Sequence, residues 1–262
     1  MRIATWNINS VRMRAGLLVR LDEIAAPDVV CLQETKVVDE LFPHNAVADL
    51  YPHRHVRGMK AYNGVAILSK LPFTATGGRD WCGREDARHV TAKFAGGVEV
   101  HNFYVPAGGD VPDPGKNDKF AHKLDFLGEM EVWLREIASP RAKRVLVGDL
   151  NIAPLEADVW SHKQLLDVVS HTPVEVDALA RVQGAHDWTD AVRYLAGDNK
   201  QLFSWWSYRA KDWRASNRGR RLDHVWVTPA LKSKLKSFEI LPDARDWPKC
   251  SDHVPVVVEI DT

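Results

Sequence analysis

The stretch RVLVGDLNIAP, residues Arg144 to Pro154, changes character within a few residues. Its first part, Arg144–Val147, is typical of a buried strand, and Asp149 and Asn151 then place a carboxylate and an amide where more core would be expected. A simple turn is one interpretation, because Gly, Asp and Asn are common turn residues. A functional site at the strand end is the other, and the rest of the chain distinguishes the two.

Many further segments have the character of strands. Short apolar or alternating runs rich in Val, Ile, Phe and Tyr predict strands at Arg2–Ile8, Val29–Gln33, Gly64–Ser69, His89–Phe94, Val98–Val105, Leu222–Thr228, Phe238–Leu241 and Val254–Ile260. Helical patterns occur between some of them, at Ser10–Pro27, Asn117–Pro140 and Thr172–Gly184. We expect Ser10 to be an N-cap and Thr172 with Glu175 to form a capping box.

Strands and helices do not alternate strictly, which argues against a doubly wound parallel sheet. Two mostly β-sheets packed face to face, with helices outside, fit the pattern better. The Gly- and Pro-rich segment Ala107–Asp118 is closely flanked by a strand and a helix, so we expect a loop there and not a domain boundary. The prediction is one α/β domain over residues 1–262.

Composition excludes several classes of protein. Lys+Arg and Asp+Glu number 35 each, so any nucleic-acid contact requires a local basic surface. The three cysteines, Cys31, Cys82 and Cys250, are widely spaced and form no CxxC motif, which argues against a disulfide framework or zinc cluster and for a reducing compartment. No apolar run approaches 18 residues, and the N-terminus lacks a signal-peptide core. We expect a soluble, cytoplasmic protein.

Polar side chains gather at the ends of the predicted strands. Each of them alone is more often a turn or cap residue than a ligand. Taken together, however, so many carboxylates, amides and an imidazole at strand ends are not explained by turns alone. Its members are Asn7, Asn9, Glu34, Asp149, Asn151, Asp223, Asp252 and His253.

The side-chain types of this cluster indicate a class of chemistry. Carboxylate and amide oxygens without thiolates suit Mg²⁺ or Mn²⁺, and a single histidine disfavours zinc. A divalent ion beside carboxylates and an imidazole polarises a phosphoryl oxygen while a carboxylate activates water. Hydrolysis of a phosphodiester or phosphomonoester is therefore the leading reaction class.

A match over residues 3–258 contains seven ordered motifs, TWNINSVR, CLQETK, YNGVAILSK, FYVPAG, VLVGDLNIAP, SWWSYRAKDWRASNRGRRLDHVWV and SDHVPV. In order and spacing they resemble the exodeoxyribonuclease III family of bacterial abasic-site endonucleases, within the endonuclease/exonuclease/phosphatase superfamily. The resemblance implies a four-layered α/β sandwich, with two mostly antiparallel sheets flanked by helices. It also implies Mg²⁺-dependent cleavage of duplex DNA 5′ to abasic sites that leaves a 3′-hydroxyl, with 3′-to-5′ exonuclease and 3′-end-cleaning activity.

The resemblance implies a metal site as well. Glu34 is similar to the principal Mg²⁺ ligand of the family, with Asn7 nearby, and Mn²⁺ is a plausible substitute. The site could hold one metal ion, or a second ion could bind at Asp149, Asn151 and His253. The full set of candidate ligands is Asn7, Glu34, Asp149, Asn151, Asp252 and His253.

Catalytic roles follow from the same resemblance. Asp149 resembles the residue that orients or deprotonates the attacking water, and Asn151 resembles a residue that contacts the phosphate. Tyr104 resembles the tyrosine that donates to a phosphate oxygen or assists the leaving group.

The imidazole of His253 is expected to contact the scissile phosphate, either as a base or as a charged stabiliser. By the same resemblance Asp252 would orient His253. Asp223 matches the family aspartate that fixes the catalytic His or Tyr.

DNA binding is expected from Ser204–His224. This segment carries six basic residues against two acidic ones, interleaved with Trp205, Trp206, Tyr208 and Trp213, a composition that suits a phosphate backbone and stacking on bases or sugars. By resemblance Trp205 lines the pocket for the abasic sugar, and Trp206 packs in the core. The candidate DNA contacts are Lys36, Tyr62, Arg88, Trp205, Arg218 and Arg220.

Three positions depart from the family pattern. Ser10 stands where Gly is common, Ala107 follows YVP where Asn or Gln is usual, and Arg220 replaces an aromatic or aliphatic residue beside the sugar pocket. These departures concern substrate fit more than chemistry.

The expected partner is duplex DNA with abasic sites or damaged 3′ ends, bound by a monomer without membrane contact. Two alternatives are a superfamily phosphoesterase that acts on inositol phosphates or phospholipids, and a DNA-binding module without catalysis. The basic, Trp-rich segment argues against the first, and the complete set of catalytic positions argues against the second.

Overall fold

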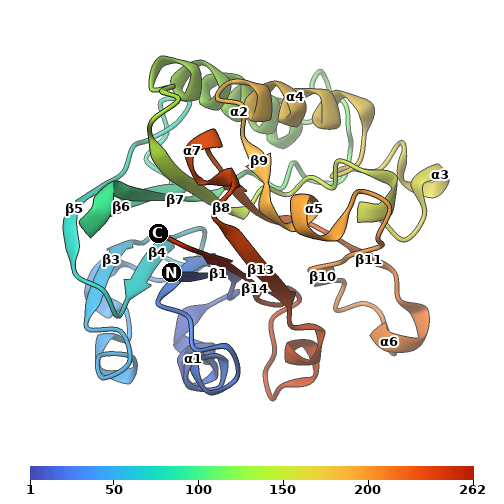
Figure 1. Cartoon of the computed structure of the whole chain (residues 1–262). Coiled ribbons are helices and arrows are strands. Elements are labelled where there is room, and N and C mark those ends of the chain that lie inside the picture. The colour runs from blue at the N-terminus through green and yellow to red at the C-terminus, as the bar shows by residue number, and fades with distance from the viewer.

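Two six-stranded sheets form the centre of the molecule in the computed structural model, which describes residues 1–262 (Figure 1). The first sheet has the spatial order β13 (Leu235–Ile240), β14 (Val256–Ile260), β1 (Arg2–Asn7), β2 (Val29–Gln33), β4 (Val65–Ser69) and β3 (His53–Arg57). The second has the order β5 (Phe73–Gly77), β6 (His89–Phe94), β7 (Val98–Tyr104), β8 (Lys143–Asp149), β12 (Asp223–Val227) and β9 (Thr189–Asp190).

Each sheet has one parallel pair at its centre, β1 with β2 and β7 with β8, and its other neighbours are antiparallel. Parallel strands require a crossover connection, commonly a helix. The crossovers contain α1 (Val11–Ala25) and α2 (Asp118–Glu136). As a result, the carboxyl ends of four central strands lie at one end of the two sheets. The predicted α/β sandwich with mostly antiparallel sheets is confirmed.

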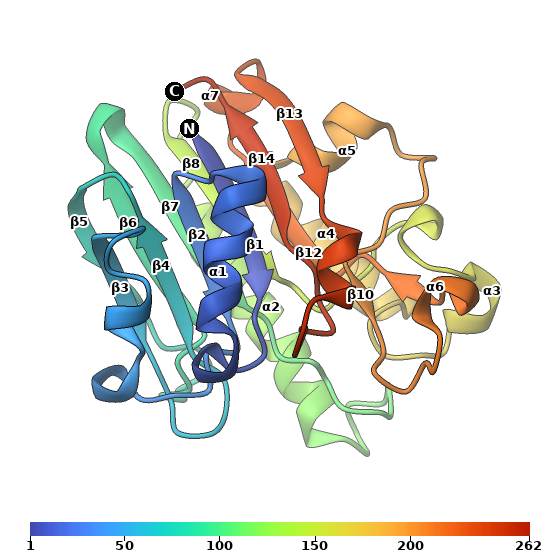
Figure 2. The ribbon, with the colours of Figure 1, turned by 90° about the horizontal axis from the view of Figure 1, so that it is seen from below.

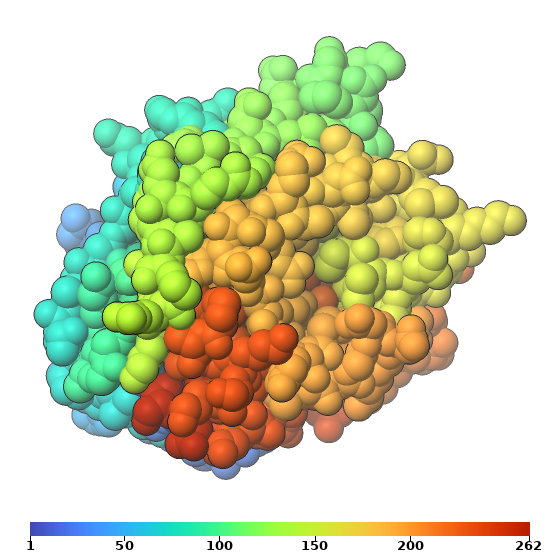
Figure 3. Space-filling view, turned by 45° about the horizontal axis from the view of Figure 1, so that its top comes forward, coloured from blue at the N-terminus to red at the C-terminus, as the bar shows by residue number.

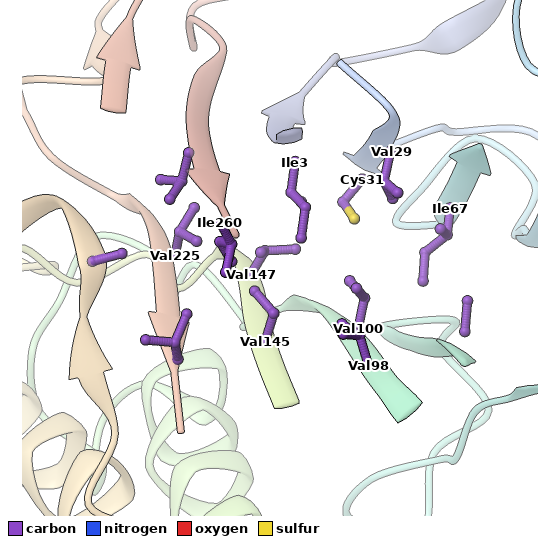
Figure 4. Packing of buried hydrophobic residues seen from close by; sticks show 14 of the residues in the cluster. Ile3, Val29, Cys31, Ile67, Val98, Val100, Val145, Val147, Val225 and Ile260 are labelled. Atoms are coloured by element: carbon purple, nitrogen blue, oxygen red, sulfur yellow. The ribbon is translucent and has the colours of Figure 1, made fainter. Parts of the chain in front are cut away.

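The main core lies between the sheets (Figure 4). Ile3 and Val29 of the first sheet face Val147 and Val225 of the second, and all four are fully buried. Side chains alternate between the two faces of a strand, so Trp6 on β1 points away from this core and packs in the outer layer with α1. Alternate residues of one strand therefore supply two layers of core.

Helices cover the outer faces of both sheets. In Figure 2 α1 lies across the first sheet. On the second sheet, α2 and α4 (Pro173–Gly184) lie side by side and form one face of the molecule (Figure 3). None of the helices combines the length and apolar character needed to cross a bilayer. The single domain expected over residues 1–262 agrees with the shared core and stays a prediction.

Short elements complete the chain between β8 and β13. They are α3 (His162–Leu165), α5 (Ala191–Ala196), β10 (Trp205–Trp206), α6 (Trp213–Ser216), β11 (Gly219–Arg220) and α7 (Pro229–Lys232). Strands β10 and β11 form a separate two-stranded sheet.

Helix starts differ from the sequence prediction in one case. Thr172 and Glu175 form the predicted capping box at the start of α4. Ser10 precedes α1 as predicted, but its side chain makes no capping hydrogen bond, and its φ is 83°. Its backbone N–H instead donates to the Glu34 carbonyl at 2.7 Å. The N-cap prediction for the Ser10 side chain is wrong because this backbone contact with the loop after β2 sets the local conformation.

The sequence patterns missed the edge strands β3 and β5. Neither is a fully buried strand, and β5 is largely exposed, so neither has the apolar run that marks the central strands. For the strands that the sequence did predict, the observed boundaries differ from the predicted ones by a few residues. Asp149, for example, is the last residue of β8.

Candidate active site

The polar strand ends predicted from the sequence meet at one place. Asn7 ends β1, Tyr104 ends β7, and Asp149 ends β8, while Glu34 directly follows β2. Pairing in the second sheet places Tyr104 and Asp223 on the two sides of Asp149. Because both sheets end at the same edge, side chains from distant parts of the chain share one buried site.

Backbone conformation directs two of these side chains into the site. Glu34 and Asn151 both have left-handed backbone conformations, with φ of 51° and 54°. Asn visits this region more readily than most residues, whereas Glu there is uncommon and marks a constrained position. Gly148 has a φ of 142°, and a Cβ built on it would lie 1.9 Å from the Phe103 carbonyl oxygen. Only glycine lets β7 and β8 approach this closely beside Asp149.

The side-chain amide of Asn7 connects two carboxylates. Its Nδ2 donates to Glu34 Oε1 at 3.0 Å and to Asp149 Oδ2 at 2.9 Å. Glu34 also accepts from the Tyr104 hydroxyl at 2.7 Å and pairs with Lys36 Nζ at 2.7 Å. Burial opposes ionisation of Glu34, but Lys36 and the hydrogen bonds from Asn7 and Tyr104 outweigh it and lower the pKa. Glu34 is therefore an ionised carboxylate.

The imidazole of His253 lies between two carboxylates. Nδ1 is 2.8 Å from Asp223 Oδ2, and Nε2 is 3.6 Å from Asp149 Oδ2. Burial alone would lower the pKa of His253, but the two carboxylates raise it well above the usual value. Burial, together with the charges of Asp223 and Glu34, raises the pKa of Asp149 against the opposing effect of His253. The site thus contains a cationic imidazole beside a carboxyl group that takes up a proton easily.

Asp252 has a different position from the one predicted. It accepts hydrogen bonds from Asn9 Nδ2 and Trp205 Nε1, both at 3.0 Å. The expectation that Asp252 orients His253 is wrong, because strand pairing places Asp223 at the imidazole and the Asp252 side chain is held by Asn9 and Trp205. Asp223 also accepts from the Ser204 hydroxyl at 2.6 Å.

The donor set fits a hard divalent cation. Carboxylate oxygens of Asp149 and Asp223 lie within 4.8 Å of each other, and Glu34 is joined to Asp149 through Asn7. Burial is the main cause of the raised pKa of Asp149, and the negative charges of Asp223 and Glu34 add to it. A cation beside Asp149 would favour its ionised form. No thiolate is present, since Cys31, Cys82 and Cys250 lie elsewhere as free cysteines. Oxygen donors of this kind suit Mg²⁺ or Mn²⁺ better than zinc.

Two cavities lie beside this cluster. The larger, about 520 Å³, is lined by Glu34, Asn151 and His253 and also by Trp205 and Arg220. Asp252 also lines it. The second cavity, about 460 Å³, lies beside Tyr104 and Arg88.

The predicted DNA contacts occupy different surroundings. Trp205 is half-buried in the larger cavity, while Trp206 is buried in the outer core as expected. Arg88 is held by Asp86 and stacks over Tyr104 at 4.9 Å. Lys36 is engaged with Glu34, so it belongs to the site itself.

Two further candidates lie outside both cavities. Tyr62 is an exposed loop side chain, 69% accessible. Arg218 is exposed and lies 4.6 Å from the ring centre of Trp160. The structure does not bring these two residues to the cluster.

Sequence reasoning missed a buried ion pair behind the site. Lys123 on α2 and Glu175 on α4 form a fully buried pair. The Lys123 ammonium also donates to the Asn151 carbonyl at 2.8 Å. The capping-box pattern marked Glu175, but nothing in the helical pattern distinguished Lys123 from an exposed lysine.

Two packed sheets that carry carboxylates, an amide and an imidazole at adjacent strand ends define a hydrolase of phosphate esters. The chain belongs to the endonuclease/exonuclease/phosphatase family, whose model matches residues 4–253. Metal dependence is general in this family.

Individual relatives match along nearly the whole chain. Exodeoxyribonuclease III of Haemophilus influenzae is 31% identical over 272 residues, covering 99% of both chains. An AP endonuclease from Archaeoglobus fulgidus has a similar structure, with a TM-score of 0.92 and 30% identity over all of both chains. A 3′ phosphatase from Neisseria, solved with a product DNA hairpin, has a TM-score of 0.90 and 29% identity, also over all of both chains. The resemblance to the exodeoxyribonuclease III family is confirmed.

Proposed function

We propose that this protein is a DNA repair nuclease that cleaves duplex DNA 5′ to abasic sites in the presence of Mg²⁺ and leaves a 3′-hydroxyl. We propose that the same site removes nucleotides and blocking groups from 3′ ends. The observation that carries the proposal is the buried group Asp149, Asp223 and His253, whose His253 lines the same cavity as Trp205. Names of the relatives support DNA as the substrate.

In this proposal Asp149 accepts a proton from the attacking water. It is buried within hydrogen-bond distance of Asn7 and close to His253. Its raised pKa places proton uptake near neutral pH, as a general base requires. The water then attacks phosphorus in line with the departing 3′ oxygen.

Two further side chains would bind the charged phosphate. His253 carries a proton that Asp223 stabilises, so it presents a cation to the phosphate. Asn151 Nδ2 donates one hydrogen to the Val105 carbonyl at 2.9 Å, and its second hydrogen is available to a phosphate oxygen. The charged-stabiliser role of His253 fits this geometry better than a role as base.

Glu34 and Asn7 would hold the Mg²⁺, with Asp149 beside them. A bound Mg²⁺ supplies positive charge to the phosphoryl oxygens in the transition state. Burial and the Glu34 and Asp149 carboxylates raise the pKa of the Tyr104 hydroxyl, so it keeps its proton and remains a donor. Tyr104 thereby positions Glu34 through their hydrogen bond.

The test uses a duplex with one tetrahydrofuran abasic analogue. We expect nicking with Mg²⁺, none with EDTA, and a loss of at least about 10²–10⁴-fold in rate for Asp149→Asn with DNA binding largely retained. An intact duplex under conditions where the protein is folded would overturn the proposal. Phosphate release from inositol phosphates in the same experiment would favour the alternative substrate class.

We further propose that the protein acts as a monomer in the cytoplasm. Folding of this chain alone brings Asp149, Asp223 and His253 within 4.8 Å of one another, which supports a monomer. Three free cysteines agree with a reducing compartment. Sedimentation at working concentration tests the first part, and cell fractionation tests the second.

A further inference from the structure

Arg220 lies in the larger cavity, on the far side of Trp205 from His253. It pairs with Trp205 across β10 and β11, and Trp205 pairs with His253 through an isolated bridge. Two strand spacings, about 10 Å, therefore separate the backbones of Arg220 and His253. The Arg220 guanidinium lies 5.3 Å from the ring centre of Trp205. One end of the cavity thus faces the phosphate-binding group, and the other presents a second cation.

The guanidinium is held by neutral groups. Its Nη1 donates to the Val169 carbonyl at 2.9 Å and to the Ser170 hydroxyl at 2.7 Å. The Ser170 backbone N–H in turn donates to both carboxylate oxygens of Glu175 at 3.0 Å.

Glu175, which holds Ser170 beside Arg220, is also connected to the phosphate-binding residue Asn151. Glu175 forms the buried pair with Lys123, whose ammonium donates to the Asn151 carbonyl. The position of Arg220 is therefore fixed relative to Asn151 before any substrate binds. Such preorganisation avoids the entropic cost of ordering a long side chain on binding.

Arg220 has no carboxylate partner within 4.0 Å, in contrast to the neighbouring buried Arg221, which pairs with Asp158 and Asp190. The Nε of Arg220 is buried and makes no hydrogen bond. Three carboxylates line the same cavity, and none pairs with Arg220. Asp252 is engaged by Asn9 and Trp205, and Glu34 by Lys36 and Tyr104. Asp110 is exposed. Glu175 attracts the Arg220 guanidinium only from a distance, because no carboxylate touches it. A half-buried cation without a carboxylate in direct contact is costly, and an anionic ligand in the cavity would offset that cost.

We propose that Arg220 makes this pocket selective for a group that carries its own negative charge and is esterified to the scissile phosphate, such as the glycolate of a 3′-phosphoglycolate end. The inference rests on the proposed nuclease function and concerns its substrate preference. A cavity of about 520 Å³ cannot admit a duplex, so it receives only a small terminal or extruded group. His253, Asn151 and Arg220 all line this cavity, so a compact carboxylate joined to a phosphate at the first two shares the space with the Arg220 guanidinium.

The reaction is ordinary hydrolysis. The water oxygen bonds to phosphorus, the bond between phosphorus and the DNA 3′ oxygen breaks, and its electron pair stays on that oxygen. The oxygen takes up a proton to give the 3′-hydroxyl. Phosphoglycolate leaves with the hydroxyl from water, and Asp149 accepts the water's other proton. Arg220 contacts the glycolate carboxylate and takes no part in bond breaking.

The test compares two duplexes with recessed 3′ ends that differ only in the blocking group. One carries 3′-phosphoglycolate, and the other carries its neutral isostere, 3′-phosphoglycolamide. A hydrogen bond to a charged group discriminates by about tenfold or more, so we expect kcat/KM to favour glycolate by at least that factor. In Arg220→Met the ratio should approach one. Arg220→Lys keeps the charge and should retain part of the preference.

Arg135→Met is the matched control, because Arg135 is an exposed residue near the end of α2 that pairs with Glu131, away from the site. It should leave the ratio unchanged. Equal cleavage of the two blocked ends by the wild-type protein, or an unchanged ratio in folded Arg220→Met, overturns this inference while leaving the nuclease function intact. Failure to cleave any of the DNA substrates overturns the proposed function itself. Thermal melting of each variant establishes that the comparison concerns folded protein.

Discussion

Asp223 Oδ2 lies 2.8 Å from Nδ1 of His253, although the two residues are 30 positions apart in the chain. Asp223 starts β12 opposite Asp149, and His253 precedes β14 of the other sheet. Their contact therefore joins the two sheets at the site. It also determines which nitrogen of the imidazole is left to face Asp149 and the substrate.

Removing the Asp223 charge should lower the pKa of His253. The Asp223 carboxylate raises this pKa through both its charge and its hydrogen bond, so Asp223→Asn should shift the titration of His253 to lower pH. Asp252→Asn should cause a smaller decrease, because Asp252 makes no hydrogen bond to the ring. NMR titration of His253 in metal-free protein measures both shifts. A larger shift for Asp252→Asn would contradict the assigned pairing.

Glu34→Gln should weaken metal binding. The substitution removes the carboxylate charge that the structure places beside Asn7 and Asp149. Residues that only hydrogen-bond to a metal's ligands change metal affinity by about 10–100-fold. Loss of a direct ligand should have at least this effect, so the half-saturating Mg²⁺ concentration for nicking should rise by at least about tenfold. Glu131→Gln removes a carboxylate on α2 distant from the site and should have no effect. An unchanged Mg²⁺ dependence in Glu34→Gln would exclude Glu34 as a ligand.

The buried His89 should make the fold less stable in mild acid. Burial and the nearby His101 and Arg79 lower the pKa of His89 well below its unfolded value. Below about pH 6.5 the unfolded chain takes up a proton at His89 that the folded chain does not, so this contribution to stability is present above that pH and is lost as pH falls.

The comparison that isolates this effect is between wild type and His89→Phe, which preserves an aromatic ring against Phe103. Other titrating groups are common to both proteins. Between pH 7.5 and 5.5 the unfolding free energy should fall more steeply in the wild type, by up to about 1.4 kcal/mol per pH unit. Urea unfolding at several pH values measures the two slopes, and equal slopes would rule out the assignment to His89.

Gly148→Ala should damage both stability and activity. The added Cβ would meet the Phe103 carbonyl oxygen at 1.9 Å, at a φ of 142° that L-residues rarely adopt. The strand end that carries Asp149 would have to move. Gly128→Ala is the control: Gly128 lies within α2, and no other part of the protein lies within 4 Å of the position that an added Cβ would take, so alanine there should stabilise by about 0.5–1 kcal/mol. Thermal melting and nicking rate check both variants.

Much of this protein follows directly from local sequence. Central strands such as Arg144–Val147 are marked by their apolar runs, and the main helices by their periodicity and, in α4, by the capping box. The motifs also place Asn7, Glu34 and Asp149 at strand ends. These features are local because they depend on the conformational preferences and burial of adjacent residues.

Only the tertiary structure decides which of these side chains touch. Asp252 is adjacent to His253 in sequence, yet its carboxylate accepts hydrogen bonds from Asn9 and Trp205 and makes none to the imidazole. Register between β8 and β12, together with the packing of the two sheets, brings Asp223 to His253 instead. The location of Arg220 beside Trp205, and of Lys123 beneath Asn151, likewise depends on pairing between distant segments. Sequence alone identified most of the polar groups that reach the site. Long-range packing determined their partners, and it also brought Lys123 to the site, because hydrogen bonds and ion pairs form between neighbours in space.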